Sequence, residues 1–102
     1  MGGLQVDLED DLENSLPKLA GLGAVVCFDL GADGQWTVDA RTRQPRLIRD
    51  GDLDPACTIK ISAENLVKLM AGRMDPMLGY TLGKIKVQGS MGVAMKLVSA
   101  LG

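Results

Sequence analysis

The stretch that decides the fold is AVVCFDLGADGQWTVDAR, residues 24–41. Its first part, Ala24–Leu30, is an apolar run of strand length. Its last part, Gln35–Arg41, alternates polar and apolar residues as a half-buried strand does. Asp33-Gly34 lies between the two parts, and this dipeptide is a strong signal for a tight turn between antiparallel strands. We therefore predict a β-hairpin over these residues.

Strands and helices follow one another on the C-terminal side of the hairpin. Three further strands are predicted from apolar alternation, at Arg46–Arg49, Cys57–Ile61 and Lys84–Gln88. Three helices each begin at a residue suited to capping, and we place them from Ser62 through Met70, from Asp75 to Gly83 and from Ser90 through Leu101. The order of elements predicts an α+β domain.

An acidic, leucine-rich segment precedes the hairpin. Its leucines recur at spacings of four and three residues, the pattern of one apolar helix face: Leu4, Leu8, Leu12, Leu16 and Leu19. Pro17 and the glycines after it end this helix. We interpret its acidic residues as a solvated face over a core, and an interaction surface is the alternative.

The strands predict a sheet with one polar and one apolar face. Charged or polar residues of the second, fourth and fifth strands share the face assigned to solvent: Thr37, Asp39, Thr58, Lys60, Lys84 and Lys86. The opposite face is apolar, and we expect the helices to cover it.

Composition excludes several classes of function. The 102 residues include no histidine, which removes Ser-His and Cys-His nucleophile pairs and histidine-containing zinc sites. The net charge of −2 and the presence of only three aromatic residues argue against binding of nucleic acid. No segment has the ~20 apolar residues that cross a bilayer. We expect a single domain over residues 1–102 in the reducing cytoplasm, without a catalytic, metal or cofactor site.

Three features allow two interpretations each. Cys27 and Cys57 lie in apolar strands, so we interpret them as packing groups, with thiol chemistry as the alternative. The arginines of residues 41–49 are interleaved with aspartates, which favours a self-neutralising edge over a phosphate or headgroup site. Methionines gather within residues 70–95, where they either fill a core or form an adaptable apolar binding surface.

Four segments in series resemble the sterol carrier protein type 2 domain family. They are Pro55–Ile59, Gly72–Pro76, Gly83–Gly89 and Ser90–Leu97. Trp36–Asp39 is similar to the second-strand motif of the same family. The resemblance runs from about residue 7 to residue 101 in consistent order and spacing.

The resemblance implies a five-stranded sheet of order 3-2-1-4-5, with helices on one face that enclose an apolar tunnel. It implies a non-catalytic domain that binds or transfers a fatty acid, a fatty acyl-CoA or a sterol-like ligand. The alternative is a non-catalytic dimerisation or accessory domain with a collapsed interior. Carried over position by position, the tunnel wall consists of Val26, Phe28, Trp36, Val38, Ile59, Ile61, Leu66, Met70, Met74, Met77, Leu78, Tyr80, Leu82, Met91, Met95 and Val98.

The end of the sequence suggests partners besides lipid. The chain ends at Gly102, whereas longer family members continue near the tunnel mouth. We therefore expect one apolar face of the last helix to stay uncovered: Met91, Met95, Val98 and Leu101. We predict that a second copy of the chain covers this face in a homodimer, and the alternative is a transient contact with a membrane surface.

Overall fold

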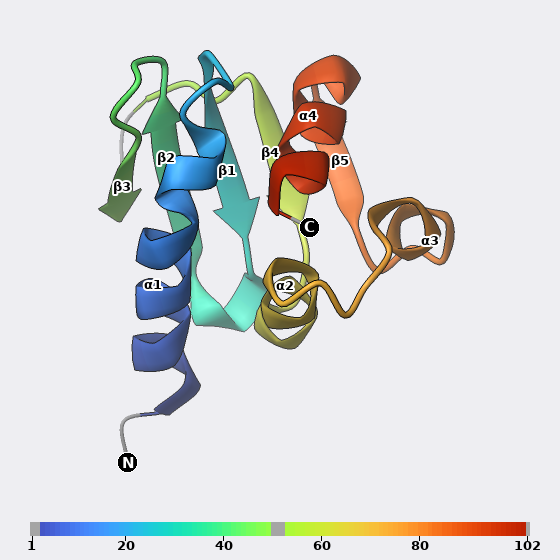
Figure 1. Ribbon diagram of the computed structural model, residues 1–102. Helices are drawn as coiled ribbons and strands as arrows, with labels where there is room; N and C mark the ends of the chain where they lie inside the picture. Colours follow the sequence, from blue (N-terminus) through green and yellow to red (C-terminus); the bar gives the residue numbers. More distant parts are fainter. Residues whose placement is uncertain (1–2, 50–52, 102) are drawn as a thin grey trace.

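Helices cover one face of a five-stranded sheet in the computed structural model, which describes residues 3–49 and 53–101 (Figure 1). The elements in chain order are α1 (Gly3–Ser15), the 3₁₀ turn η1 (Leu16–Leu19), β1 (Ala24–Asp29), the 3₁₀ turn η2 (Gly31–Asp33), β2 (Gln35–Ala40), β3 (Arg46–Arg49), β4 (Cys57–Lys60), α2 (Ala63–Met70), α3 (Pro76–Thr81), β5 (Lys86–Gly89) and α4 (Met91–Leu101). α1, α2 and α4 lie in front of the strands in Figure 1, and α3 lies beside them near β5. The predicted α+β class is confirmed.

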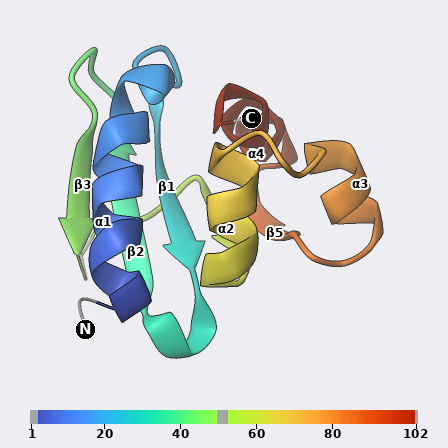
Figure 2. The same ribbon diagram turned by 60° about the horizontal axis from the view of Figure 1, so that its bottom comes forward.

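The sheet is organised around β1. This strand pairs antiparallel with β2 through the predicted hairpin, and it pairs parallel with β4 on its other side. β3 adds to β2 and β5 adds to β4, both antiparallel, so the order is β3-β2-β1-β4-β5. This order confirms the one that the resemblance implies. The chain must cross the sheet between β3 and β4, and residues 53–56 pass behind β1, on the side away from α1 (Figures 1 and 2).

Apolar residues of the central strands face the helices. The register sets Val26 opposite Val38 and Phe28 opposite Trp36, and Ile59 of β4 lies on the other side of Phe28. All five are 0–2% exposed. They form one core cluster with leucines of the helices and of η1, namely Leu8, Leu12, Leu19, Leu66, Leu69, Leu97 and Leu101. The phase predicted for the first strand, with Val26 and Phe28 toward the helices, is correct.

The leucine pattern of the first segment extends past the α-helix. α1 ends at Ser15, and the 3₁₀ turn η1 continues to Leu19 because Pro17 is tolerated only near the start of a helical segment. Leu8, Leu12 and Leu19 are buried as predicted, whereas the side chain of Leu4 lies outside the described residues.

The predicted helix caps are present. Ser62, Asp75 and Ser90 each accept a backbone N–H from two or three residues further along the chain, at 2.9–3.2 Å. The fifth strand, by contrast, begins at Lys86 and not at Lys84. The backbone N–H groups of residues 84 and 85 donate to the carbonyl oxygen of Gly79 in α3, at 2.9 and 3.2 Å, so they are not available to β4.

The face of the sheet turned away from the helices is less open than its polar alternation predicts. Thr37 and Asp39 are only 6% and 7% exposed, so the expectation of a solvated face is wrong for β2. The reason is that β2 is an interior strand, and Thr37 lies between Cys27 of β1 and Ile48 of β3. Thr58 of β4 is half-buried, and Lys60 of the same strand is exposed.

The arginine-rich connection neutralises a carboxylate of the sheet, as predicted. An Arg41 guanidinium nitrogen lies 2.8 Å from Oδ2 of Asp39, and one of Arg46 lies 4.0 Å from the same atom. The hydrogen bond from Arg41 lowers the pKa of Asp39 to about 2. Residues 50–52 and the side chain of Arg49 lie outside the described part of the chain.

Gly89 is a position where no other residue fits. A Cβ at this position would lie 2.5 Å from the carbonyl oxygen of Ala56, which already accepts the backbone N–H of Ser90 at 2.8 Å. Gly34 has the same φ of +93° but has nothing within 4 Å of its Cβ position. Substitution of Gly34 therefore tests backbone strain alone, whereas substitution of Gly89 adds a steric conflict to the same strain.

We predict that Gly34→Ala lowers the free energy of unfolding by about 1–2 kcal/mol, through positive φ alone. Gly89→Ala is expected to cost at least about 2 kcal/mol more, because backbone atoms of β4 must move as well. Urea denaturation of both variants measures the difference. Equal losses would contradict the close approach of β5 to residue 56.

Candidate functional site

The predicted tunnel wall divides into a buried and an exposed set. Eight of its members are 0–5% exposed and belong to the core cluster between sheet and helices: Val26, Phe28, Trp36, Val38, Ile59, Ile61, Leu66 and Val98. Val26, Phe28, Val38, Ile59 and Leu66 have no accessible surface, so no water-sized space lies beside them and they pack directly on their neighbours.

The remaining members lie toward the surface. Met70, Met74 and Met95 are half-buried. Five others are 41–60% exposed, and four of these belong to α3 or its C-terminal cap: Met77, Leu78, Tyr80, Leu82 and, on α4, Met91. Apolar side chains of this size concentrated on one short helix form an exposed apolar patch, which we call the α3 patch (Met77, Leu78, Tyr80 and Leu82).

α3 stands apart from the other helices, at the β5 side of the molecule (Figures 1 and 2). Asp75 caps its N-terminus by accepting the N–H of Met77 at 2.9 Å. Its one buried residue is Gly79, whose Cβ position lies 2.9 Å from Sδ of Met74 and 3.0 Å from Cδ1 of Ile85. The missing side chain of Gly79 thus lets α3 rest on these two residues while its apolar side chains face outward.

A shallow apolar groove of about 200 Å³ follows α3. Met74, Leu78, Gly79 and Leu82 supply its apolar wall. Basic residues and one carboxylate complete it: Lys68, Arg73, Lys84 and Asp75. The groove therefore offers an apolar surface with a positively charged border.

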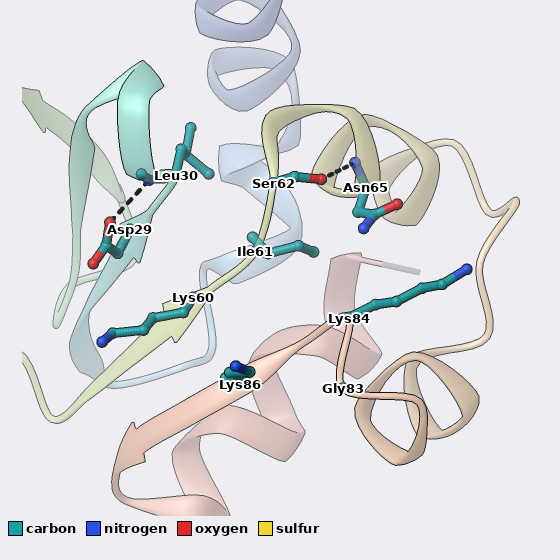
Figure 3. Close-up of a pocket in the computed structure, with 10 residues that line it drawn as sticks. Asp29, Leu30, Lys60, Ile61, Ser62, Asn65, Gly83, Lys84 and Lys86 are labelled. Carbon is teal, nitrogen blue, oxygen red and sulfur yellow. Dashed lines mark hydrogen bonds between the residues drawn. The ribbon is translucent and has the colours of Figure 1, made fainter.

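A larger open pocket of about 470 Å³ lies on the other side of Lys84 (Figure 3). The apolar part of its wall comes from Leu30 and Ile61, both of which are 5% exposed. Lys60, Lys84 and Lys86 surround this apolar wall, together with the polar residues Asp29, Ser62 and Asn65. We call this the lysine pocket. Ile61 is the one member of the predicted tunnel wall that lines it.

The lysines of this pocket were not among the predicted site residues. Their alternation assigns Lys60 and Lys86 to one face of the sheet, but it does not say that the two strands are neighbours. The β4–β5 register sets them directly opposite each other. The strand order that the resemblance implies makes the two strands neighbours, but the register that pairs these two lysines is decided by the folded sheet.

The face of the last helix is more covered than predicted. Leu101 is 0% exposed and Val98 is 4% exposed, so the expectation of an uncovered face is wrong for both residues. The reason is that α4 packs on η1 as well as on β4 and β5. Met91, at the start of the helix, stays 44% exposed.

Other kinds of site find no support in the described residues. In residues 3–49 and 53–101, no group of three or more Cys, Asp or Glu side chains is arranged to hold a metal ion. In the same part of the chain, no helix is both long enough and apolar enough to span a bilayer.

Comparison with known proteins identifies the family. The profile of the SCP-2 sterol transfer family matches residues 5–102. The chain belongs to this family. The match extends over both the helix-covered sheet and α3, so the SCP-2 resemblance of the sequence is confirmed.

Curated relatives of the SCP-2 family are identical to this chain at about a third of the aligned positions. Sterol carrier protein 2 of Rattus norvegicus is 34% identical over 98 residues, which cover 94% of this chain and 18% of the rat protein. Non-specific lipid-transfer protein-like 1 of Caenorhabditis elegans is 34% identical over 74 residues, which cover 70% of this chain and 63% of the worm protein. The chain therefore spans less than a fifth of the rat relative.

Solved SCP-2 structures have the same fold. The sterol carrier protein domain 2 of Helicoverpa armigera is 32% identical, with a TM-score of 0.65 over 96% of this chain and 79% of that chain. Sterol carrier protein 2 like 2 of Aedes aegypti is 18% identical, with a TM-score of 0.77 over 95% of this chain and 98% of that chain.

The two cysteines of this SCP-2 domain lie on opposite faces of the sheet. Cys57 pairs with Val26 in the register and faces the helices, whereas Cys27 pairs with Thr58 on the other face. Burial raises the pKa of Cys57 to about 11 and also raises the pKa of Cys27. Both groups are therefore protonated and poorly nucleophilic near neutral pH, which favours the packing interpretation.

We predict that Cys27→Ala combined with Cys57→Ala lowers the free energy of unfolding by about 1–3 kcal/mol, because buried volume is lost. Native thiols should react with iodoacetamide only as fast as the domain opens. Mass spectrometry of the alkylated protein over time, with and without urea, checks this. Rapid alkylation of either cysteine without urea would contradict the packing role.

Proposed function

We propose that this chain is a lipid-binding or lipid-transfer domain, in which an acyl chain or sterol-like ligand enters between α3 and the sheet. The observation that carries the proposal is the α3 patch, where large apolar side chains stay exposed beside an apolar groove. Membership of the SCP-2 sterol transfer family supports it. The sixteen predicted residues remain the proposed lining.

Ligand entry requires the core to separate locally. Five members of the proposed lining have no accessible surface, so a ligand that contacts them must displace protein contacts when it binds. α3 is suited to move because it has six residues and rests on Met74 and Ile85 through Gly79. When it moves outward, Met74, Met77 and Leu82 can exchange protein or water contacts for contacts with the ligand. Methionine side chains adapt to such a change because they are flexible and polarizable.

The energetics favour a long apolar ligand. Each buried methylene contributes about 0.8 kcal/mol, so a C16 chain supplies roughly 12 kcal/mol before the costs of association and ordering are subtracted. This gain opposes the cost of displacing α3 and the core contacts behind it. A solved protein of the same fold, the palmitated form of SCP2L2 from Aedes aegypti, supports the choice of a C16 probe (TM-score 0.71, 18% identity).

No covalent chemistry is part of this proposal. The chain has no histidine, and its two thiols are held in the protonated form. Non-covalent binding needs only the apolar and charged side chains of the groove and the lysine pocket. Cytoplasmic location, a homodimer and a transient membrane contact remain predictions, and Met91 is the most exposed member of the helix face to which the two contacts were assigned.

One observation favours the accessory-domain alternative. The core side chains of β1, β2 and β4 are closely packed, as expected of a collapsed interior. Native mass spectrometry separates the two functions. A one-to-one complex of the delipidated protein with palmitate is expected, and a protein that takes up no lipid but sediments as a dimer would establish the alternative.

We predict that Met77→Glu weakens binding of palmitate at least tenfold and leaves the fold intact. Met77 is 55% exposed, so a carboxylate there stays solvated in the free protein and is expected to change the free energy of unfolding by no more than about 0.5 kcal/mol. In the complex, the same carboxylate meets the acyl chain and loses water.

The matched control for this variant is Gln44→Glu. It adds the same charge in the exposed connection between β2 and β3, and it should bind palmitate as the wild type does. Urea denaturation verifies that both variants fold. Wild-type affinity in a folded Met77→Glu variant would exclude α3 from the binding site.

A further inference from the structure

We propose that the lysine pocket receives the anionic headgroup of a single-chain amphiphile whose acyl chain lies against α3. This inference rests on the proposed lipid-binding function and adds to it the place and the residues that hold the headgroup. Two ligand classes share this combination of a negative charge and an apolar chain. The charge is a carboxylate in a fatty acid, and it is carried by phosphates in an acyl-CoA.

The pocket collects cations on an acidic protein. Lys60, Lys84 and Lys86 line it in a chain of net charge −2, and all three are exposed. Figure 3 shows their side chains spread around Ile61, with Lys60 on one side and Lys84 on the other. Asp29 is the one carboxylate among the lining residues, and its Oδ1 already accepts the N–H of Gly31 at 3.0 Å.

The lysines have no carboxylate partner whose position is described. Within residues 3–49 and 53–101, the ion pairs closer than or equal to 4.0 Å are those of Arg41 and Arg46 with Asp39, at the far edge of the sheet. Asp29 of β1 lies beside Lys60 on one side in the register, and on the other side Lys60 faces Lys86 directly across β4 and β5. Like charges in such a cross-strand pair destabilise a sheet, and an anion held between them would remove the repulsion.

The pocket also places charged side chains next to an apolar wall, as recognition of an amphiphile requires. Its volume of about 470 Å³ lies in the range of small-molecule sites. Leu30 and Ile61 in its wall are core residues, so the apolar interior reaches the surface here. Lys84 lines both this pocket and the groove along α3. Because Lys84 borders both, the chain of a ligand whose headgroup is held at this residue can reach the groove along α3.

The experiment compares three ligands with the same C16 chain: palmitate, palmitoyl-CoA and hexadecanol. Dissociation constants are measured below the micellar concentrations, on delipidated protein. The variants are Lys60→Gln combined with Lys86→Gln, and the charge-conserving pair Lys60→Arg with Lys86→Arg. The matched control is Lys18→Gln with Lys96→Gln, which removes the same charge at a separate depression bounded by η1 and α4.

We expect the wild type to bind at least one of the two anions more tightly than hexadecanol. The Lys60→Gln, Lys86→Gln pair should bind that anion about five- to tenfold more weakly, since each exposed charge contact contributes modestly to the binding free energy. The affinity of the glutamine pair for hexadecanol should stay within twofold of the wild-type value. The arginine pair and the control pair should bind the anion with an affinity within twofold of wild type. The loss should shrink in 1 M salt, where the Debye length falls to about 3 Å.

Each contrary result has a distinct meaning. If hexadecanol and both anions bind equally, or if the glutamine pair weakens hexadecanol as much as the anions, the headgroup site is refuted and the lipid-binding function stands. If none of the three ligands binds the wild type, the lipid-binding function itself is refuted, and the headgroup site with it. A loss confined to palmitate or to palmitoyl-CoA supports the site and identifies its headgroup.

Discussion

The pairing of β1 on both of its edges is the constraint on which the rest of the structure depends. Its antiparallel register with β2 aligns Phe28 with Trp36, and its parallel register with β4 brings Ile59 to the same row. A shift of one residue on either side would turn these side chains to the other face of the sheet. The leucines of α1, α2 and α4 would then meet polar side chains of β2 or β4 in place of Trp36 or Ile59.

This constraint also explains why the surface of the domain carries so much apolar area on α3. The sheet presents a limited apolar face, and α1, α2 and α4 already cover most of it (Figure 1). α3 therefore contacts the fold mainly through Gly79, and Met77 and Leu82 remain more than half exposed. A small domain with a closed core and an exposed apolar helix can gain binding area without a permanent cavity, provided that the helix moves.

The charge distribution follows the same division of the sheet. At the β3 edge, Arg41 and Arg46 neutralise Asp39, and the strong hydrogen bond from Arg41 keeps that carboxylate ionised. At the β5 edge, lysines lie next to an apolar wall and close to α3. Lysines on an edge strand also hinder strand addition by other chains. The same residues can therefore protect the sheet edge and attract an anion.

The sequence by itself determined the elements, the caps of α2, α3 and α4 and the family, because these depend on local alternation, local hydrogen bonds and motifs in fixed order. The phase of β1 followed from the resemblance, since this strand is apolar on both faces. Only the tertiary structure decided which predicted lining residues lie in the core and which lie on α3, that Leu101 and Asp39 are covered, and that Lys60 and Lys86 lie directly opposite each other. These outcomes depend on register and packing between elements that are distant in the chain. Alternation within one strand gives the face of a residue but not what lies beside it or over it.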